Sequence, residues 1–125
     1  MPAYALALLR PADQLAEDVF VYIETIQTTL DPFGGRFLVH GADVEVREGT
    51  WPGAPVIIGF PGIEEARAWY DSPAYQELLP LRTDHIPGDV VLVEGVAPGY
   101  DAATTAAAYR AAAAHPAAAQ PTSAR

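Results

Sequence analysis

The sequence predicts an α+β domain in which a β-α-β-β-α-β succession forms an antiparallel sheet with helices on one face, the split βαβ arrangement. Three observations predict this fold. Four apolar segments have the composition and alternation of strands, and two segments between them have the periodicity of amphipathic helices. With 125 residues, 50% of them hydrophobic, the chain is also long enough to form one small core.

The first strand is expected at residues 3–10, where large side chains at Tyr4, Leu6 and Leu8 alternate with small alanines. A helix is expected over residues 14–30, with Asp13 as its N-cap, because an apolar stripe faces a polar one along that segment. The proline and glycines that follow the stripe end the helix.

A second strand is expected at residues 36–41, and its alternation places His40 on the side of Arg36 and Leu38. A bulge at residues 41–43 and a continuation of the strand at residues 44–47 are expected to follow. The next loop leads into an apolar return strand over residues 54–60, which is typical of a central strand covered on both faces.

The second half of the chain repeats the pattern. A helical region over residues 63–71 is interrupted at Ser72-Pro73, because proline cannot continue the hydrogen bonding of a helix. A shorter helix over residues 74–79, a loop and a last strand over residues 89–95 complete the domain. Residues 1–96 are therefore expected to form the domain, and residues 97–125 an alanine-rich helix and a flexible tail.

Both faces of the predicted sheet are apolar, so helices on one face would leave the other face uncovered. Such a face is larger than the apolar patches that monomers expose. Two copies that stack sheet against sheet would bury it in a closed two-fold interface, with Trp51 as an expected dimer contact. The sequence therefore predicts a homodimer.

Composition excludes several classes of function. The net charge of −9, from 16 acidic residues and 7 arginines without any lysine, disfavours nucleic acid and anionic membrane surfaces as partners. The sequence has no cysteine, no metal-ligand motif, no phosphate-binding glycine loop and no G-x-S-x-G nucleophile motif. No metal and no cofactor are expected, and the lack of a leader or apolar span predicts a cytoplasmic protein.

A set of ordered motifs resembles a known family. The set consists of GGRFLVHG (34–41), EGTWP (48–52), ARAWYDSPAYQ (66–76), Leu81-Arg82 and Val93-Glu94-Gly95. Together they resemble the ferredoxin-like, dimeric α/β-barrel superfamily, and within it a small bacterial family known as a domain of unknown function. The superfamily includes cofactor-independent monooxygenases, cyclases, isomerases, dehydratases and haem-dependent members, so the resemblance implies a fold and not one activity.

The chain departs from the family pattern at two places. His40-Gly41-Ala42 stands where arginine and two glycines are common, and Thr83-Asp84-His85 stands where small residues are usual. Both departures introduce an imidazole, which can act as an acid or a base near neutral pH. His40 and His85 are therefore the candidate catalytic residues, although a hydrogen-bonding role at the sheet edge or a solvated loop would also explain them.

Four further residues are candidates for substrate binding. Arg82 would anchor a carboxylate or enolate through its fork of donors, unless it pairs with a surface acid. Tyr22 and Tyr70 are candidate hydrogen-bond donors, and Arg36 is expected beside His40. The aromatic cluster of Trp69, Tyr70 and Tyr75 is otherwise expected to be scaffold.

These residues lead to one principal hypothesis and two alternatives. The principal one is a small cofactor-independent enzyme that performs acid/base chemistry (isomerisation, cyclisation or elimination) on an organic carbonyl or enol compound, in secondary metabolism. The alternatives are a cofactor-free monooxygenase of the same fold and a non-catalytic dimeric protein that binds a small organic molecule. The position of the histidines relative to a cavity distinguishes an enzyme from a scaffold.

Overall fold

The computed structural model describes residues 1–114 and confirms the predicted α+β fold. Its four strands form one antiparallel sheet in the order β2-β3-β1-β4, so that β3 lies between β1 and β2, as in a ferredoxin-like fold. The elements in chain order are β1 (Ala3–Leu9), α1 (Glu17–Leu30), the short 3₁₀ helix η1 (Asp31–Phe33), β2 (Arg36–Val39), β3 (Ala54–Phe60), α2 (Ile63–Asp71), α3 (Pro73–Leu78), α4 (Pro80–Thr83), β4 (Gly88–Glu94) and α5 (Ala102–Ala113).

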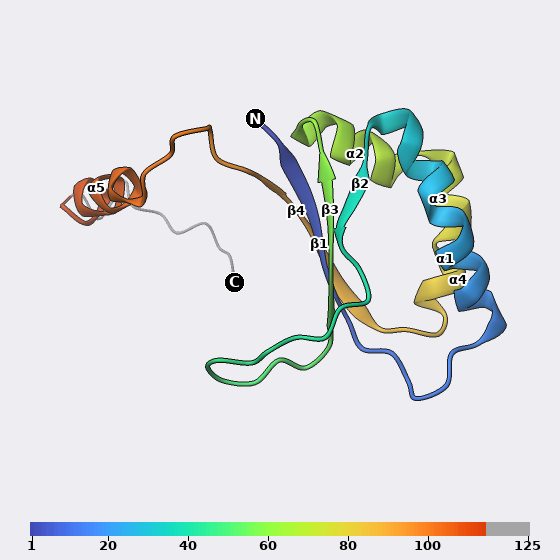
Figure 1. Ribbon diagram of the computed structural model, residues 1–125. Coiled ribbons are helices and arrows are strands. Elements are labelled where there is room, and N and C mark those ends of the chain that lie inside the picture. Colours follow the sequence, from blue (N-terminus) through green and yellow to red (C-terminus); the bar gives the residue numbers. More distant parts are fainter. Residues whose placement is uncertain (115–125) are drawn as a thin grey trace. The chain divides into compact units, whose positions relative to one another are not determined.

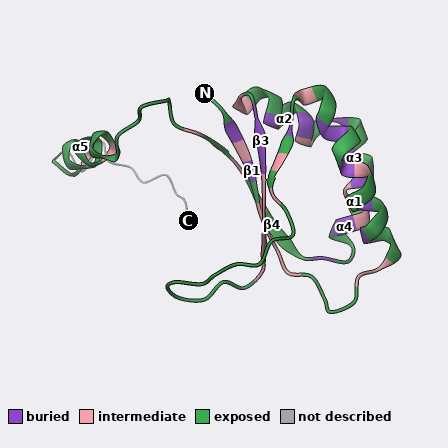
Figure 2. Ribbon diagram, viewed as in Figure 1, coloured by how far each residue is buried: buried purple, intermediate pink, exposed green. Residues whose placement is uncertain are grey.

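Helices α1 to α4 cover one face of the sheet (Figure 1). The core lies between these two layers, and Figure 2 shows that both the strands and the helices contain buried residues. Trp69 of α2 is buried at the centre of this core, and its indole Nε1 donates a hydrogen bond to Thr29 Oγ1 at 3.0 Å. This bond links α2 to α1 and satisfies two buried polar groups at once.

Strand β1 carries small side chains on the side that faces the helices. Ala3 and Ala5 are buried on this side and Ala7 is half-buried, whereas Tyr4 and Leu6 point to the opposite face. The alternation in the sequence predicts this division between large and small residues. Of these alanines, Ala5 and Ala7 leave room between the sheet and the helices.

Helix α1 begins at Glu17, later than the predicted start at Gln14. Ala16 is the N-cap residue, and it makes no capping hydrogen bond through its side chain, so the predicted cap at Asp13 is wrong. The first turn instead carries Glu17 and Asp18, whose negative charges interact favourably with the positive end of the helix dipole and so stabilise the start of the helix.

Strand β2 is shorter and less regular than predicted. It covers Arg36–Val39, and its pairing with β3 shifts register between Phe37 and Val39. A register shift interrupts the alternation of side chains. His40 therefore lies on the side of Phe37, with the two rings stacked 4.7 Å apart, and not on the side of Arg36 as predicted.

Residues 40–53 form no strand, although one is predicted over residues 44–47. Gly41 has a φ of 81°, a left-handed conformation that suits glycine and turns the chain out of the sheet. Val46 and Trp51 of this segment remain exposed.

Prolines begin helices in the second half of the domain. Ser72 caps α3 by accepting a hydrogen bond from the Tyr75 amide at 3.2 Å, and Pro73 occupies the first helical position. Pro80 occupies the first position of α4, where the sequence predicts the end of a helix and then a loop, and this helix has no side-chain cap. The additional turn brings Arg82 into the protein interior.

The face of the sheet opposite the helices is apolar and partly exposed. Its exposed large side chains include Leu6, Leu38, Val91 and Val93. This observation agrees with the sequence prediction that both faces of the sheet are apolar.

The chain divides into two compact units, Met1–Gly95 and a second unit that begins at Val96. The second unit contains α5, which Asp101 caps by accepting a hydrogen bond from the Ala103 amide at 2.9 Å. The flexible tail expected at the end of the chain lies outside the described residues. No helix in the described part of the chain is both long and apolar enough to span a membrane.

Candidate functional site

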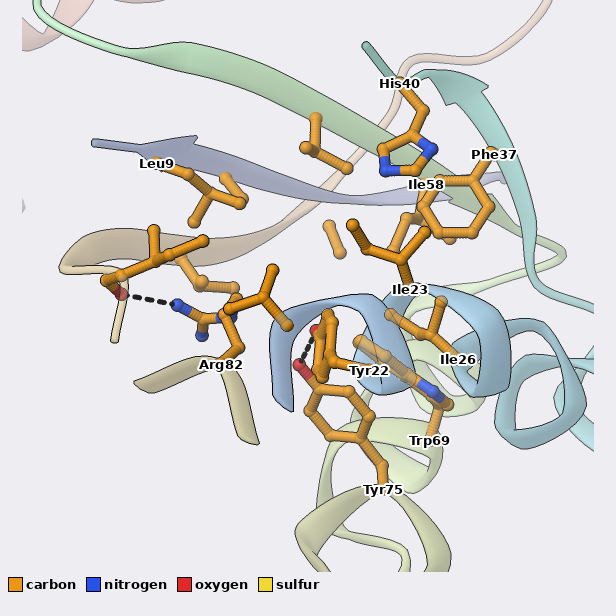
Figure 3. A pocket seen from close by; sticks show the side chains of 16 residues that line it. Leu9, Tyr22, Ile23, Ile26, Phe37, His40, Ile58, Trp69, Tyr75 and Arg82 are labelled. Atoms are coloured by element: carbon orange, nitrogen blue, oxygen red, sulfur yellow. Dashed lines mark hydrogen bonds between the residues drawn. The ribbon is translucent and has the colours of Figure 1, made fainter. Parts of the chain in front are cut away.

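A cavity of about 90 Å³ lies between the inner face of the sheet and the helices. The strands contribute Ala5 and Ala7 to its wall. Ile58 of β3, together with Tyr22 and Ile26 of α1, also lines it (Figure 3). The cavity follows from the alanines of β1, because larger residues at these positions would fill the space above the sheet. Most of its lining is apolar, and four polar side chains interrupt it: Tyr22, His40, Tyr75 and Arg82.

Arg82 is the buried charge of the cavity. The residue is only 5% exposed, and its Nη1 donates a hydrogen bond to the Ile86 carbonyl oxygen at 3.3 Å. Its guanidinium carbon lies 5.9 Å from the centre of the Tyr22 ring, within range of a cation–π interaction. Among residues 1–114 no carboxylate forms an ion pair with Arg82. A buried cation without a counter-charge is costly, so this position favours an anion in the cavity.

Tyr22 and Tyr75 form a pair of buried phenols. Their hydroxyl oxygens lie 2.6 Å apart in a hydrogen bond that joins α1 to α3. Burial raises the pKa of both phenols, and the positive charge of Arg82 opposes this shift only in part. Both phenols are therefore protonated at neutral pH, and they can donate hydrogen bonds but cannot act as bases. One hydroxyl donates to the other, which leaves one phenol proton for a ligand.

His40 lies across the cavity from these groups. It follows β2, stacks on Phe37 at an interplanar angle of 26°, and contributes to the cavity wall while remaining exposed (Figure 3). An imidazole at the rim can exchange protons both with solvent and with a bound molecule. Of the residues that line the cavity, His40 has the side chain best suited to act as a base near neutral pH.

His85 does not reach the cavity, contrary to the expectation that it joins His40 there. Because α4 extends to Thr83, the following turn directs His85 to the exterior, where its Nε2 lies 3.1 Å from Asp18 Oδ2. This contact bridges the start of α1 and the end of α4. Its position corresponds to the solvated role considered from the sequence.

Arg36 and Tyr70 also lie outside the cavity. Arg36 is exposed and pairs in register with Gly59, one position away from the Phe37 pair, so it belongs to the outer face of the sheet. Tyr70 is half-buried, and its ring lies 5.5 Å from that of Tyr75. It contributes to an adjacent surface pocket and not to the cavity.

Sequence reasoning missed Tyr75, which it assigned to the scaffold. The signal available was the Ser72-Pro73 break, because a proline at the first position of a new helix redirects the residues that follow. Tyr75 is two residues beyond that proline and 2% exposed. No group of three or more metal-ligating side chains occurs within residues 1–114.

Solved structures share this fold. The RPA0582 protein of Rhodopseudomonas palustris, a protein of unknown function, is 18% identical, with a TM-score of 0.54 over 78% of this chain and 84% of its own. Rv0793 from Mycobacterium tuberculosis is 11% identical, with a TM-score of 0.56 over 80% of this chain and 100% of its own. SnoaB from Streptomyces nogalater, a cofactor-independent oxygenase, is 10% identical, with a TM-score of 0.52 over 80% of this chain and 98% of its own. At such identities the similarity shows the fold alone.

None of the curated proteins compared with the chain matches it. A family profile matches residues 2–96, which is well over half of the chain and contains the whole sheet and every side chain of the cavity. This match confirms the resemblance seen in the sequence motifs. The chain therefore belongs to the family described as domain of unknown function (DUF1330), and it has a ferredoxin-like fold.

Proposed function

We propose that the protein is an enzyme that performs acid/base chemistry, without a cofactor, on a small organic carbonyl or enol compound. The observation that supports this most strongly is Arg82, a buried cation without a carboxylate partner in the described residues, beside two protonated phenols in an apolar cavity. Such a site favours a ligand whose oxygen becomes negatively charged, as a carbonyl oxygen does when it becomes an enolate. Isomerisation, cyclisation and elimination of a carbonyl compound pass through this change when they begin with loss of a proton next to the carbonyl.

The cavity supports a division of roles. Arg82 and the free phenol proton of the Tyr22–Tyr75 pair would stabilise the enolate oxygen, because they are held in place before the reaction begins. His40 would take a proton from the carbon next to the carbonyl and return it at another position. The apolar walls exclude water, which strengthens both interactions.

Two alternative functions, a monooxygenase and a protein that only binds, can be distinguished from the proposed enzyme by experiment. SnoaB is a cofactor-independent oxygenase with a similar fold, and the apolar, aromatic lining of this cavity would also suit a monooxygenase that acts on an electron-rich substrate. A dimeric protein that binds a small organic molecule would keep the anion site and use no base. The three functions differ in whether they move a proton, consume oxygen or only bind.

We propose in addition that the protein is a homodimer joined through the outer sheet face. The exposed apolar side chains of that face support this proposal, as does Trp51, which with Leu6 and Ile57 lines a groove on it. The helices and the cavity would then face away from the interface.

The enzyme hypothesis is tested by exchange in heavy water. The protein is incubated with levulinate, acetylacetone and related carbonyl compounds, and nuclear magnetic resonance follows the loss of protons next to the carbonyl. The substitution His40→Gln should slow this hydrogen–deuterium exchange by about 100-fold or more, as expected for loss of a general base. His85→Gln is the matched control and should exchange at the wild-type rate.

Equal losses in the two histidine variants would contradict the role of His40. Oxygen consumption that accompanies substrate loss would favour the monooxygenase. Binding that raises the melting temperature without exchange or turnover would favour a protein that only binds.

A further inference from the structure

A second pocket lies on the other side of Arg82. This outer pocket, about 400 Å³ in volume, is lined by Arg10, Tyr70, Arg82, Thr83, Ile86 and Val90, together with the backbone turn into β4. Arg82, Ile86 and Val90 line the cavity as well, so the two spaces adjoin at these residues. The outer pocket is the more polar of the two, because two guanidinium groups and two hydroxyls occur among its lining residues.

Arg10 is held at this pocket by its backbone. It directly follows β1, and its amide donates a hydrogen bond to the Pro87 carbonyl oxygen at 2.9 Å. Its Nη1 lies 3.0 Å from Asp89 Oδ2, in an ion pair whose side chains are 39% and 73% exposed. Exposed pairs of this kind contribute little stability, so a ligand carboxylate can replace Asp89 as the partner of Arg10.

Because the protein is acidic overall, the presence of two arginines at the outer pocket points to the kind of ligand that binds there. The chain carries 16 acidic residues and a net charge of −9, so most of its surface repels an anion. Two of its 7 basic residues nevertheless line the outer pocket, and one of them is buried without a carboxylate partner among the residues that the structure describes. A pair of arginines in such a protein favours recognition of a carboxylate, which a guanidinium can bind through two parallel hydrogen bonds.

We infer that the outer pocket is a carboxylate subsite of the same binding site, and that the ligand is a short-chain oxo acid. Its carboxylate binds Arg82 from the outer pocket, under the charge of Arg10. Its carbonyl-bearing chain occupies the cavity, where the carbonyl oxygen lies beside the Tyr22–Tyr75 pair and accepts from another of the five N–H donors of the Arg82 guanidinium. The inference rests on the proposed function for the carbonyl group, whereas the carboxylate subsite stands on the two arginines alone.

The size of the cavity limits the chain of this acid. Its volume of about 90 Å³ is smaller than the roughly 150 Å³ of an engineered cavity that accepts benzene. A compact aliphatic chain fits this space, whereas an aromatic ring would require the sheet and helices to move apart. The cavity therefore selects small aliphatic oxo acids over their aryl analogues.

Isothermal titration calorimetry with three probes tests the inference. Levulinate has the carboxylate, the carbonyl and a short chain; methyl levulinate lacks the charge; benzoylpropionate adds an aromatic ring. We expect levulinate to bind at least about tenfold more tightly than its ester, as a charge-assisted hydrogen bond would require. Benzoylpropionate should bind more weakly than levulinate.

One arginine variant tests where the carboxylate binds, and a second arginine variant serves as its control. Arg10→Gln should weaken levulinate binding by about fivefold, in the upper range for an exposed ion pair, and should leave the ester unaffected. Arg47→Gln is the matched control, because Arg47 is exposed on the 40–53 segment and lines neither the cavity nor the outer pocket. Higher salt should reduce the binding of levulinate and not that of the ester.

Each outcome separates the subsite from the proposed function. If Arg10→Gln binds levulinate as tightly as Arg47→Gln does, the outer pocket is not a carboxylate subsite, even where exchange in heavy water supports the enzyme. If Arg10→Gln weakens binding and no proton exchange occurs, the subsite stands and the enzymatic proposal fails. Equal binding of the acid and its ester would overturn the inference outright.

Discussion

At the scale of single residues, Arg82 is the side chain whose position is hardest to explain by folding alone. A guanidinium that is 5% exposed and has no carboxylate partner among the described residues destabilises the empty protein. Its hydrogen bond to the Ile86 carbonyl and its approach to the Tyr22 ring compensate only in part. A loss of stability in the empty protein in return for binding is a common trade-off at functional sites.

The effect of Arg82→Met on stability follows from this uncompensated charge. Methionine fills a similar volume without a charge, so the free energy of unfolding should stay the same or rise by about 1 kcal/mol, as when buried ionic groups are replaced by apolar ones. Urea denaturation of the wild type and of Arg67→Met, an exposed control on α2, gives the comparison. Destabilisation by more than about 3 kcal/mol would identify Arg82 instead as a structural clamp between α4 and β4.

At the scale of elements, β1 determines that there is a cavity at all. Ala3, Ala5 and Ala7 face the helices, but they do so in different surroundings. Ala3 is fully buried in the core and does not line the cavity, whereas Ala7 is half-buried and does. The same strand thus supplies a tightly packed position and an open one on the same face.

The two alanines form a matched pair for substitution. Ala3→Val should destabilise the protein by about 1–3 kcal/mol, because extra methyl groups in a filled core force strain. Ala7→Val should change stability by less than about 1 kcal/mol, because the new methyl groups enter empty space, and it should abolish ligand binding. Chemical denaturation and calorimetry provide both readouts. Equal destabilisation by the two changes would show that the space beside Ala7 is already filled.

At the scale of the whole molecule, the uncovered sheet face determines the expected assembly. Light scattering at micromolar concentration should give about twice the 13.3 kDa of one chain, because this apolar face requires a partner. Val91→Glu, at the middle of β4, should produce monomers, since it places a charge on the apolar face that the proposed interface would bury. Val21→Glu is the control: Val21 is exposed on α1, in the opposite layer, and the variant should remain dimeric. A wild-type protein of 13.3 kDa in solution would exclude the dimer.

The order of strands and helices could be predicted from the sequence alone. Periodicity is a local property, and the alternation of residues 3–10 and the helical stripe of residues 14–30 reveal it without reference to the rest of the chain. The apolar character of both sheet faces was also readable in this way. Arg82 and Tyr22 could be chosen as candidates from the sequence as well, but from the chemistry of their side chains and not from periodicity. Helix ends were less predictable, because proline both ends helices and begins them.

The composition of the cavity was decided by tertiary structure. A register shift between Phe37 and Val39 arises from the pairing of β2 with β3, and it moves His40 to the side of the sheet that faces the helices. An extra turn at α4 buries Arg82 and leaves His85 at the surface, beside Asp18. These outcomes depend on contacts between residues far apart in the chain, whereas periodicity reports only on near neighbours. The sequence by itself therefore determined the layers of this protein, and only the packing of one layer on the other decided which side chains share a site.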